Sequence, residues 1–278
     1  MTLPDLHTTK TDYDRDGVAL QRGLLDKNEV AALHEEVQRL WQTQADLRAQ
    51  NLRLALRRDS HGDWALDRLD PVADISVVFE RLNRDPRLLS IARTFLGSEV
   101  RVLKEKIIYK RPGVQGFGFH RDGPYFGNSG VPDGEMMSLC IAIDPTTAEN
   151  GATEFYPQLR LQVLDSVTEE PRDIAETELE NQPSLQPFLK PGDAVMFDGL
   201  VPHRAAMNHS RRSRCTYFVT YAPERYTDCR ERYYQHRELE QANERASEFQ
   251  GPFYIIDANN RKRVVQAQGS PASHVFHR

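Results

Sequence analysis

Two segments within the first hundred residues carry hydrophobic side chains at helical spacing. The first covers about residues 26–47, where Asp26 suits a helix N-cap and Glu29 follows three residues later. The second begins near Pro86 and ends before Gly97, a residue type that commonly follows the last helical turn. The spacing predicts two amphipathic helices, with inward-facing residues Val30, Leu33, Val37, Leu40, Leu88, Ile91, Ala92 and Phe95.

From about residue 100 the pattern changes to short β-rich runs. These runs are VLKEKIIYK, MMSLCIAID, ATEFY, DAVMFD and CTYFVTYA, and Gly, Pro, Asn and Asp residues separate them. Short strands divided by turn residues predict a β-sandwich or barrel. A further helix is expected at about 225–247, and the acidic stretch 160–186 predicts a long functional or mobile loop.

The segments outside these elements are less regular. Residues 11–25 indicate an entry strand and a turn, and residues 48–75 indicate a solvated, partly helical loop. The loop admits a second interpretation, because arginine forks suit carboxylate and phosphate groups. It could form a patch at the mouth of a pocket for an anionic substrate, made by Arg53, Arg57, Arg58 and Arg68.

The composition is that of an ordinary globular protein, with 39% hydrophobic and 28% charged residues among 278. A net charge of −5 does not favour nucleic-acid binding. The sequence contains no apolar run long enough for a membrane span and no secretory signal at its start, so we expect a cytoplasmic protein with three reduced cysteines. Nothing in the sequence specifies an oligomeric state.

Candidate chemistry begins with the segment GFHRDGPYFG. His120 and Asp122 are two residues apart, so a β-strand would direct both side chains to the same face. His203 follows 83 residues later. Two histidines and one carboxylate can occupy one face of an iron(II) octahedron and leave three positions open. We therefore predict that His120, Asp122 and His203 are iron ligands, and that His209 is not.

Arg214 makes this pattern more specific. It lies eleven residues after His203 and opens the apolar run CTYFVTYA. An arginine on a strand beside the distal histidine can form a bidentate salt bridge with a dicarboxylate. This is the group needed to hold the C5 end of 2-oxoglutarate while its 2-oxo acid end chelates the metal.

Together these motifs resemble the phytanoyl-CoA dioxygenase family. The resemblance rests on His120-x-Asp122, the PGD turn at 191–193, His203, the NHS that follows it, Arg214 and the segment IAIDPTTAENGATEFYP. It implies a mainly β fold with flanking helices, a double-stranded β-helix or jelly roll. We expect one oxygenase domain over 1–278, with its jelly-roll core at about 100–222, N-terminal helical support at 12–98 and a C-terminal helical extension at 223–278.

The resemblance also implies the reaction. Iron(II), 2-oxoglutarate and O2 would oxidise a small molecule, with succinate and CO2 as co-products. Hydroxylation is the default, and desaturation or ring formation are alternatives. Arg214 would bind 2-oxoglutarate, and Ser138, Lys106 and Tyr109 are expected to contact it as well.

The substrate and two rival functions stay open. Clustered basic residues fit a small anionic substrate or an acyl-CoA, namely Lys104, Lys106, Lys110 and Arg111. The acidic loop fits a cationic group instead, and the aromatic residues near His120 fit a hydrophobic natural product. The rivals are a non-catalytic jelly-roll binding or sensor protein, and a cupin-type metalloenzyme that does not use 2-oxoglutarate.

Overall fold

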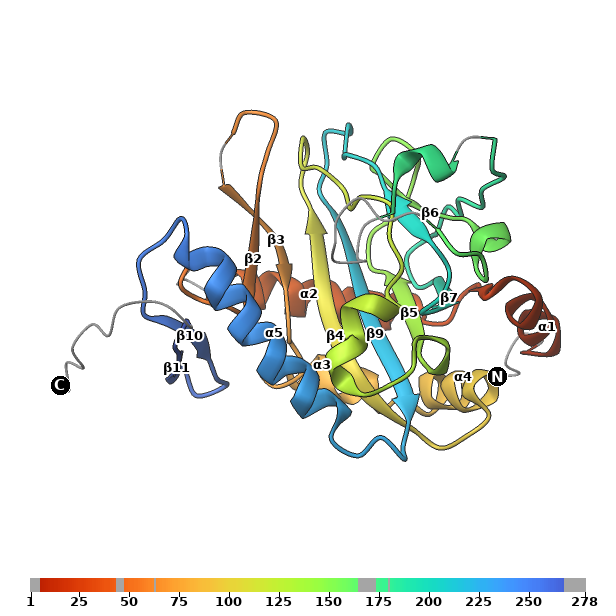
Figure 1. Ribbon diagram of the computed structural model, residues 1–278, viewed down its shortest axis with the longest axis horizontal. Coiled ribbons are helices and arrows are strands. Elements are labelled where there is room, and N and C mark those ends of the chain that lie inside the picture. Colours follow the sequence, from red (N-terminus) through yellow and green to blue (C-terminus); the bar gives the residue numbers. More distant parts are fainter. Residues whose placement is uncertain (1–5, 44–47, 63, 165–173, 180, 268–278) are drawn as a thin grey trace.

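A large antiparallel sheet organises the chain. The structure, a computed structural model, describes residues 6–43, 48–62, 64–164, 174–179 and 181–267. Seven strands form this main sheet in the order β1-β7-β5-β9-β4-β3-β2 (Figure 1). Their bounds are β1 Val18–Gln21, β2 Leu54–Arg58, β3 Trp64–Leu69, β4 Val100–Lys110, β5 Met137–Ala142, β7 Ala194–Asp198 and β9 Arg214–Pro223.

A small second sheet faces part of the main one. It pairs β6, Thr153–Phe155, with β8, His203–Ala205, and an isolated antiparallel bridge joins His120 to His203 beside it. A large and a small sheet with outer helices are the jelly-roll architecture that the sequence predicted, and the fold prediction is confirmed.

Helices cover the outer face of the main sheet. They are α2, Lys27–Thr43, α3, Val77–Asn83, and α4, Pro86–Leu96 (Figure 1). The alternation along β9 explains the packing, because successive side chains of a strand point to opposite faces. Cys215, Tyr217, Val219 and Tyr221 are buried in the core shared with these helices. The residues between them face the inside of the jelly roll, and these are Arg214, Thr216, Phe218 and Thr220.

The two predicted helices form as the sequence indicated. Asp26 accepts hydrogen bonds from the backbone of Asn28 and Glu29 at 2.8 and 2.9 Å, and Glu29 accepts one from the Asp26 backbone at 2.7 Å. This is the reciprocal capping box expected before α2. Gly97 ends α4 with a φ of 65°, which glycine adopts without strain. Residues 44–47, the predicted end of the first helix, lie outside the described residues.

Two predictions about the flanking segments are wrong and one is right in part. The predicted strand and turn form as β1 and the residues that follow it, but the first part of that segment belongs to helix α1, Leu6–Asp16. Residues 48–75, predicted as a loop, contain β2 and β3, which extend the main sheet beyond β4. The C-terminal extension is not only helical, since a hairpin of β10, Phe253–Ile256, and β11, Lys262–Val265, follows helix α5, Cys229–Ala246. The jelly-roll sheet therefore draws strands from outside 100–222.

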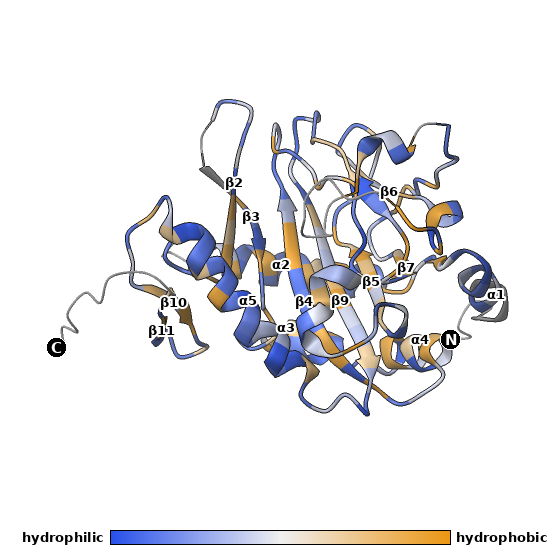
Figure 2. Ribbon diagram, in the orientation of Figure 1, coloured by the Kyte–Doolittle hydropathy of each residue, from blue (hydrophilic) through white to orange (hydrophobic). Residues whose placement is uncertain are grey.

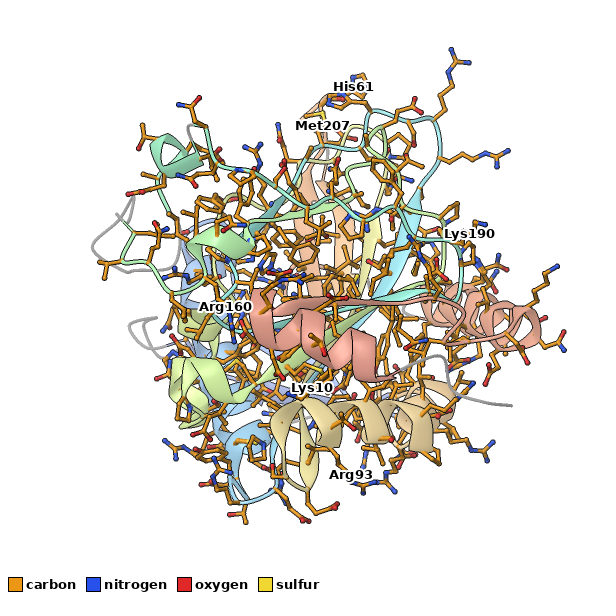
Figure 3. All side chains as sticks on the ribbon, turned by 90° about the vertical axis from the view of Figure 1, so that its right-hand side faces the viewer. Lys10, His61, Arg93, Arg160, Lys190 and Met207 are labelled. Carbon is orange, nitrogen blue, oxygen red and sulfur yellow. The ribbon has the colours of Figure 1, made fainter. Side chains whose placement is uncertain are left out.

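The distribution of polarity follows these layers. Figure 2 shows hydrophobic residues on α4 and the central strands, whereas α5 is largely hydrophilic. Figure 3, seen from the side, places His61 and Met207 at one end of the molecule and Arg93 at the opposite end. None of the helices in the described part of the chain combines the length and the apolar character that a membrane span requires.

Candidate metal centre and cosubstrate pocket

His120, Asp122 and His203 converge inside the jelly roll. The backbones of the two histidines exchange hydrogen bonds of 3.0 and 2.8 Å, which fixes the imidazoles side by side. Asp122 follows at the turn into a 3-10 helix, η1, Gly123–Ser129. Its Oδ1 lies 3.8 Å from His120 Nε2 and 3.9 Å from His203 Nε2. One ligand atom of each residue lies within 4.8 Å of the other two, a spacing that suits a shared ion.

The second nitrogen of each imidazole is already bound. His120 Nδ1 is 2.7 Å from the carbonyl of Gly118, and His203 Nδ1 is 3.0 Å from the carbonyl of Val201. A carbonyl can only accept, so each Nδ1 carries the proton and donates it. Each Nε2 therefore presents a lone pair toward Asp122, as metal-binding histidines do.

The electrostatics match this donor set. Burial lowers the pKa of His120 to about 3 and also lowers the pKa of His203, so both imidazoles are neutral at physiological pH. Burial alone would raise the pKa of Asp122, but the positive potential of its surroundings, to which Lys106 and Lys104 contribute, outweighs burial and the pKa is lowered. Two neutral imidazoles and one carboxylate are a donor set that fits iron(II).

Neighbouring polar groups hold the ligands in place. Ser138 Oγ lies 3.4 Å from Asp122 Oδ2 and 2.8 Å from Thr220 Oγ1. On the other side, Asp198 accepts hydrogen bonds from the backbone of Leu200 and Val201 at 3.0 and 3.1 Å. These bonds shape the turn in which the carbonyl of Val201 accepts the hydrogen bond from His203 Nδ1. Sequence reasoning missed the roles of Asp198 and Thr220, because one depends on the conformation of the turn after β7 and the other on the pairing of β5 with β9.

A pocket connects the three residues to Arg214. Its empty volume is about 470 Å³, part of it open to solvent. The lining residues are Lys106, Ile108, Lys110, Phe117, His120, Asp122, Thr153, His203, Arg204, Ala205, Arg214 and Phe218. A larger hollow of about 1170 Å³ lies beside α3 and α4 and shares no lining residue with it. The pocket that contains the candidate ligands is therefore the functional candidate.

Arg214 is buried at the pocket and has only neutral partners. Its guanidinium donates to the carbonyls of Gly151 and Asn150 at 2.9 and 3.3 Å, and to Thr216 Oγ1 at 3.3 Å. Within the described residues, no carboxylate lies within 4.0 Å of it. Other arginines in the same part of the chain are placed differently, because Arg211 and Arg212 are exposed and Arg204 pairs with Glu154. Arg214 is thus a buried cation with no counter-ion in the described part of the chain.

Lys110 stands directly opposite Arg214 in the pairing of β4 with β9. It is fully buried and donates to the carbonyls of Gly151 and Ala206. Burial, and then the charge of Arg214, lower the pKa of Lys110 to about 7. Sequence reasoning did not assign Lys110 to the cosubstrate. The signal was available, since Lys106 and Lys110 have the same parity on one strand.

The three other residues predicted to contact 2-oxoglutarate lie in different places. Lys106 lies in the pocket, with its ammonium 5.2 Å from the ring of Phe218. Tyr109 does not reach the pocket, and this part of the prediction is wrong. As an odd-numbered residue it points to the outer face, where its ring lies 5.0 Å from that of Trp41. Ser138 lies beside Asp122, away from Arg214.

The arginines of the predicted patch do not all lie at the pocket. Arg53 is buried and binds Asp74 at 2.7 Å, so it is structural. The guanidinium groups of Arg57 and Arg68 lie over the ring of Phe117, which lines the pocket. The side chain of Arg58 lies outside the described residues.

A jelly roll that brings two neutral imidazoles and a carboxylate to one point beside a buried, uncompensated arginine defines the class of mononuclear non-haem iron oxygenases. The chain belongs to the phytanoyl-CoA dioxygenase (PhyH) family, whose model matches residues 13–216. As a member, it is an iron(II)- and 2-oxoglutarate-dependent dioxygenase. The family thus favours this class over the binding protein and the cupin-type enzyme.

Individual relatives agree with this assignment. The ectoine dioxygenase of Bordetella bronchiseptica is 31% identical over 229 residues, which cover 75% of this chain and 72% of the relative. The methylphosphonate hydroxylase of Gimesia maris is 34% identical over 146 residues, covering 51% and 53% of the two chains. The crystal structure of EctD from S. alaskensis superposes with a TM-score of 0.69 at 23% identity, covering 81% and 80%, and shows the likeness of fold.

Proposed function

We propose that His120, Asp122 and His203 hold iron(II) and that Arg214 and Lys110 together bind the C5 carboxylate of 2-oxoglutarate. The observation that carries this proposal is the pair of buried cations at the end of the same pocket as the three ligands. A dicarboxylate that chelates the metal at one end would bring its other carboxylate to this pair. When bound, iron(II) with 2-oxoglutarate and O2 supplies the oxidising power, and succinate and CO2 are released.

The protein positions the metal ligands and excludes water from part of the site. The two Nδ1 hydrogen bonds keep the imidazole Nε2 atoms available, and Ser138 orients the carboxylate of Asp122. Ile108 and Thr216 lie between the cation pair and Phe218 on the inner face of the main sheet. Phe155 and Phe197 pack on the ring of His203 at centroid distances of 5.6 and 4.9 Å and exclude water from that side.

We propose hydroxylation of a small polar molecule as the reaction. Two of the relatives carry the names ectoine dioxygenase and methylphosphonate hydroxylase, which refer to small polar molecules. These names support hydroxylation over desaturation or ring formation, and a small polar substrate over an acyl-CoA. Asp122 stands in the carboxylate position, which favours hydroxylation over halogenation.

Anaerobic titration of the iron(II)-loaded protein with 2-oxoglutarate tests the proposal. We expect a visible absorption band that saturates with one equivalent, followed by slow succinate release when air is admitted. The Arg214→Gln variant should need a much higher concentration of 2-oxoglutarate for the same band. A protein that binds iron(II) but gives neither band nor succinate would contradict the proposed use of 2-oxoglutarate.

A further inference from the structure

Three cationic side chains converge on one aromatic ring at the edge of the pocket. The centroid of Phe117 lies 4.2 Å from Arg57 Cζ, 5.5 Å from Arg68 Cζ and 5.7 Å from Lys106 Nζ. The same ring lies 6.2 Å from the imidazole of His120. The cations therefore gather around a ring that lines the pocket next to the metal ligands.

The ring is held in a fixed place. The carbonyl of Phe117 accepts a hydrogen bond of 3.0 Å from the backbone of Ala205, next to β8. Arg57 donates to the carbonyl of Gly116 at 3.0 Å and to Asp67 at 3.1 Å, so its own charge is paired. Arg57 thus serves as a support for this segment, and the other two cations are available.

Arg68 and Lys106 lack sufficient counter-charge. Among the residues that the structure describes, the nearest carboxylate to Arg68 is that of Asp67, at 3.9 Å and already bound by Arg57, and the buried Nε of Arg68 has no hydrogen-bond partner. Within the described part of the chain, no carboxylate lies within 4.0 Å of Lys106 Nζ. Asp70 lies nearby, but it pairs with Lys104 at 3.0 Å.

Positive charge exceeds negative charge in this part of the pocket wall. Among the described residues, the carboxylates of Asp67 and Asp70 pair with Arg57 and Lys104, and Arg68 and Lys106 add two further cations. The carboxylate of Asp122 is committed to the metal ion. Two positive charges therefore remain uncompensated in a partly desolvated site, where an unpaired charge is costly unless a ligand brings an opposite charge.

We infer that the substrate carries an oxyanion, and that Arg68 and Lys106 bind it against the ring of Phe117. This inference rests on the proposed function. Two uncompensated cations, one of them a guanidinium fork, suit a dianionic phosphonate or phosphate monoester better than a single carboxylate. Along the inner face of β4, Ile108 lies between Lys106 and Lys110, so we place the substrate oxyanion and the C5 carboxylate of 2-oxoglutarate in separate anion sites. The anionic group lies within a few bonds of the oxidised carbon.

Calorimetry on the wild-type protein tests this directly, in the presence of iron(II) and 2-oxoglutarate without O2. The probe is ethylphosphonate, with its neutral diethyl ester as the matched control and propionate as the singly charged comparison. We expect ethylphosphonate to bind at least about tenfold more tightly than the ester, the scale of a charge-assisted contact. Propionate should lie between the two. Equal binding of ethylphosphonate and the ester would overturn the inference.

Variants then locate the anion. Arg68→Gln and Lys106→Met should each weaken ethylphosphonate binding about tenfold or more, and Arg68→Lys should retain part of it. Arg93→Gln is the control, since Arg93 is exposed in the last turn of α4, on the outer side of the main sheet. Binding that is unchanged in both Arg68→Gln and Lys106→Met would place the anion elsewhere, including on the metal, and would overturn the inference.

Failure of the inference differs from failure of the proposed function. The anaerobic 2-oxoglutarate band and succinate release in air are measured on the same protein sample. If both are present and ethylphosphonate binds no better than its ester, the dioxygenase stands and the anionic subsite is wrong. If both are absent, the proposed function itself fails.

Discussion

Lys110 and Arg214 face each other across the β4–β9 ladder, and both side chains are buried in the same pocket. Like charges directly opposite one another destabilise a sheet. Backbone carbonyls solvate both groups but do not neutralise them. The arrangement is therefore costly in the free protein and becomes favourable when a carboxylate binds between the two, which is the reason to assign the pair to 2-oxoglutarate.

Replacing Arg214 should weaken cosubstrate binding strongly. Arg214→Gln removes a buried charge-assisted fork, which contributes about 2–5 kcal/mol, so we expect the 2-oxoglutarate KM to rise by more than tenfold. Arg212→Gln, on the exposed turn two residues earlier, is the control and should leave KM unaltered. Steady-state succinate production measures both variants. An unchanged KM in Arg214→Gln would mean that another residue anchors the cosubstrate.

The affinity for 2-oxoglutarate should depend on pH through Lys110. Its pKa is lowered to about 7, so the ammonium is charged below this pH and neutral above it. The C5 carboxylate of 2-oxoglutarate binds the charged form of Lys110 more tightly than the neutral form. Affinity should therefore be highest below about pH 7 and decrease as pH rises, by no more than tenfold per pH unit because one proton is linked. Anaerobic titrations from pH 6 to 9 measure the slope. Lys110→Arg should flatten it, and an equally steep slope in that variant would contradict the assignment.

The sequence predicted the metal side of the site because its signals are local or chemically distinctive. His120 and Asp122 are two residues apart, and His203 and Arg214 flank a single turn between β8 and β9. Tyr109 shows where the same reasoning failed. It was grouped with Lys106, yet the two residues differ in parity on β4 and point to opposite faces. Periodicity alone would have excluded Tyr109 and selected Lys110.

The hairpin of β2 and β3 could not be recognised for a different reason. A strand is usually found by an alternation of apolar and polar residues, with the apolar face toward a core. Here Arg57 and Arg68 approach the pocket through Phe117, and Asp67 sits at a break in the register between the two strands. Polar residues therefore occupy part of the interior, and the segment has the composition of a loop.

Removing one ligand should remove the metal. His203→Ala leaves two donors, and we expect the affinity for iron(II) to decrease by at least about a hundredfold and turnover to stop. Asp122→Ala should behave in the same way. His209→Ala is the control, because His209 is an exposed histidine six residues further on. Metal content after gel filtration, together with succinate release, measures the effect. Unimpaired turnover in His203→Ala would refute the ligand assignment.

Ser138 should act on the metal through Asp122. Ser138→Ala removes the hydroxyl that lies 3.4 Å from the Asp122 carboxylate and bridges to Thr220. Outer partners of metal ligands typically contribute 10–100-fold in affinity, so we expect a loss near the lower end for iron(II). The KM for 2-oxoglutarate measured at saturating iron should change little. If that KM rises and the iron affinity does not, Ser138 contacts the cosubstrate, as the sequence first suggested.

Arg160 should stabilise both the fold and the metal centre through Asp198. The two side chains form an ion pair with Nε 2.6 Å from the carboxylate, and Asp198 is 2% exposed. Arg160→Ala leaves that carboxylate buried without a counter-ion, which typically costs about 3–5 kcal/mol of unfolding free energy.

Asp198 also shapes the turn that holds His203, so iron(II) affinity should decrease as well. The control is Arg15→Ala, which removes an exposed pair with Asp16 and should leave the free energy of unfolding nearly unchanged. Urea unfolding with and without metal separates the two effects. If Arg160→Ala loses stability but keeps its full iron(II) affinity, Arg160 stabilises the fold and does not act on the metal centre.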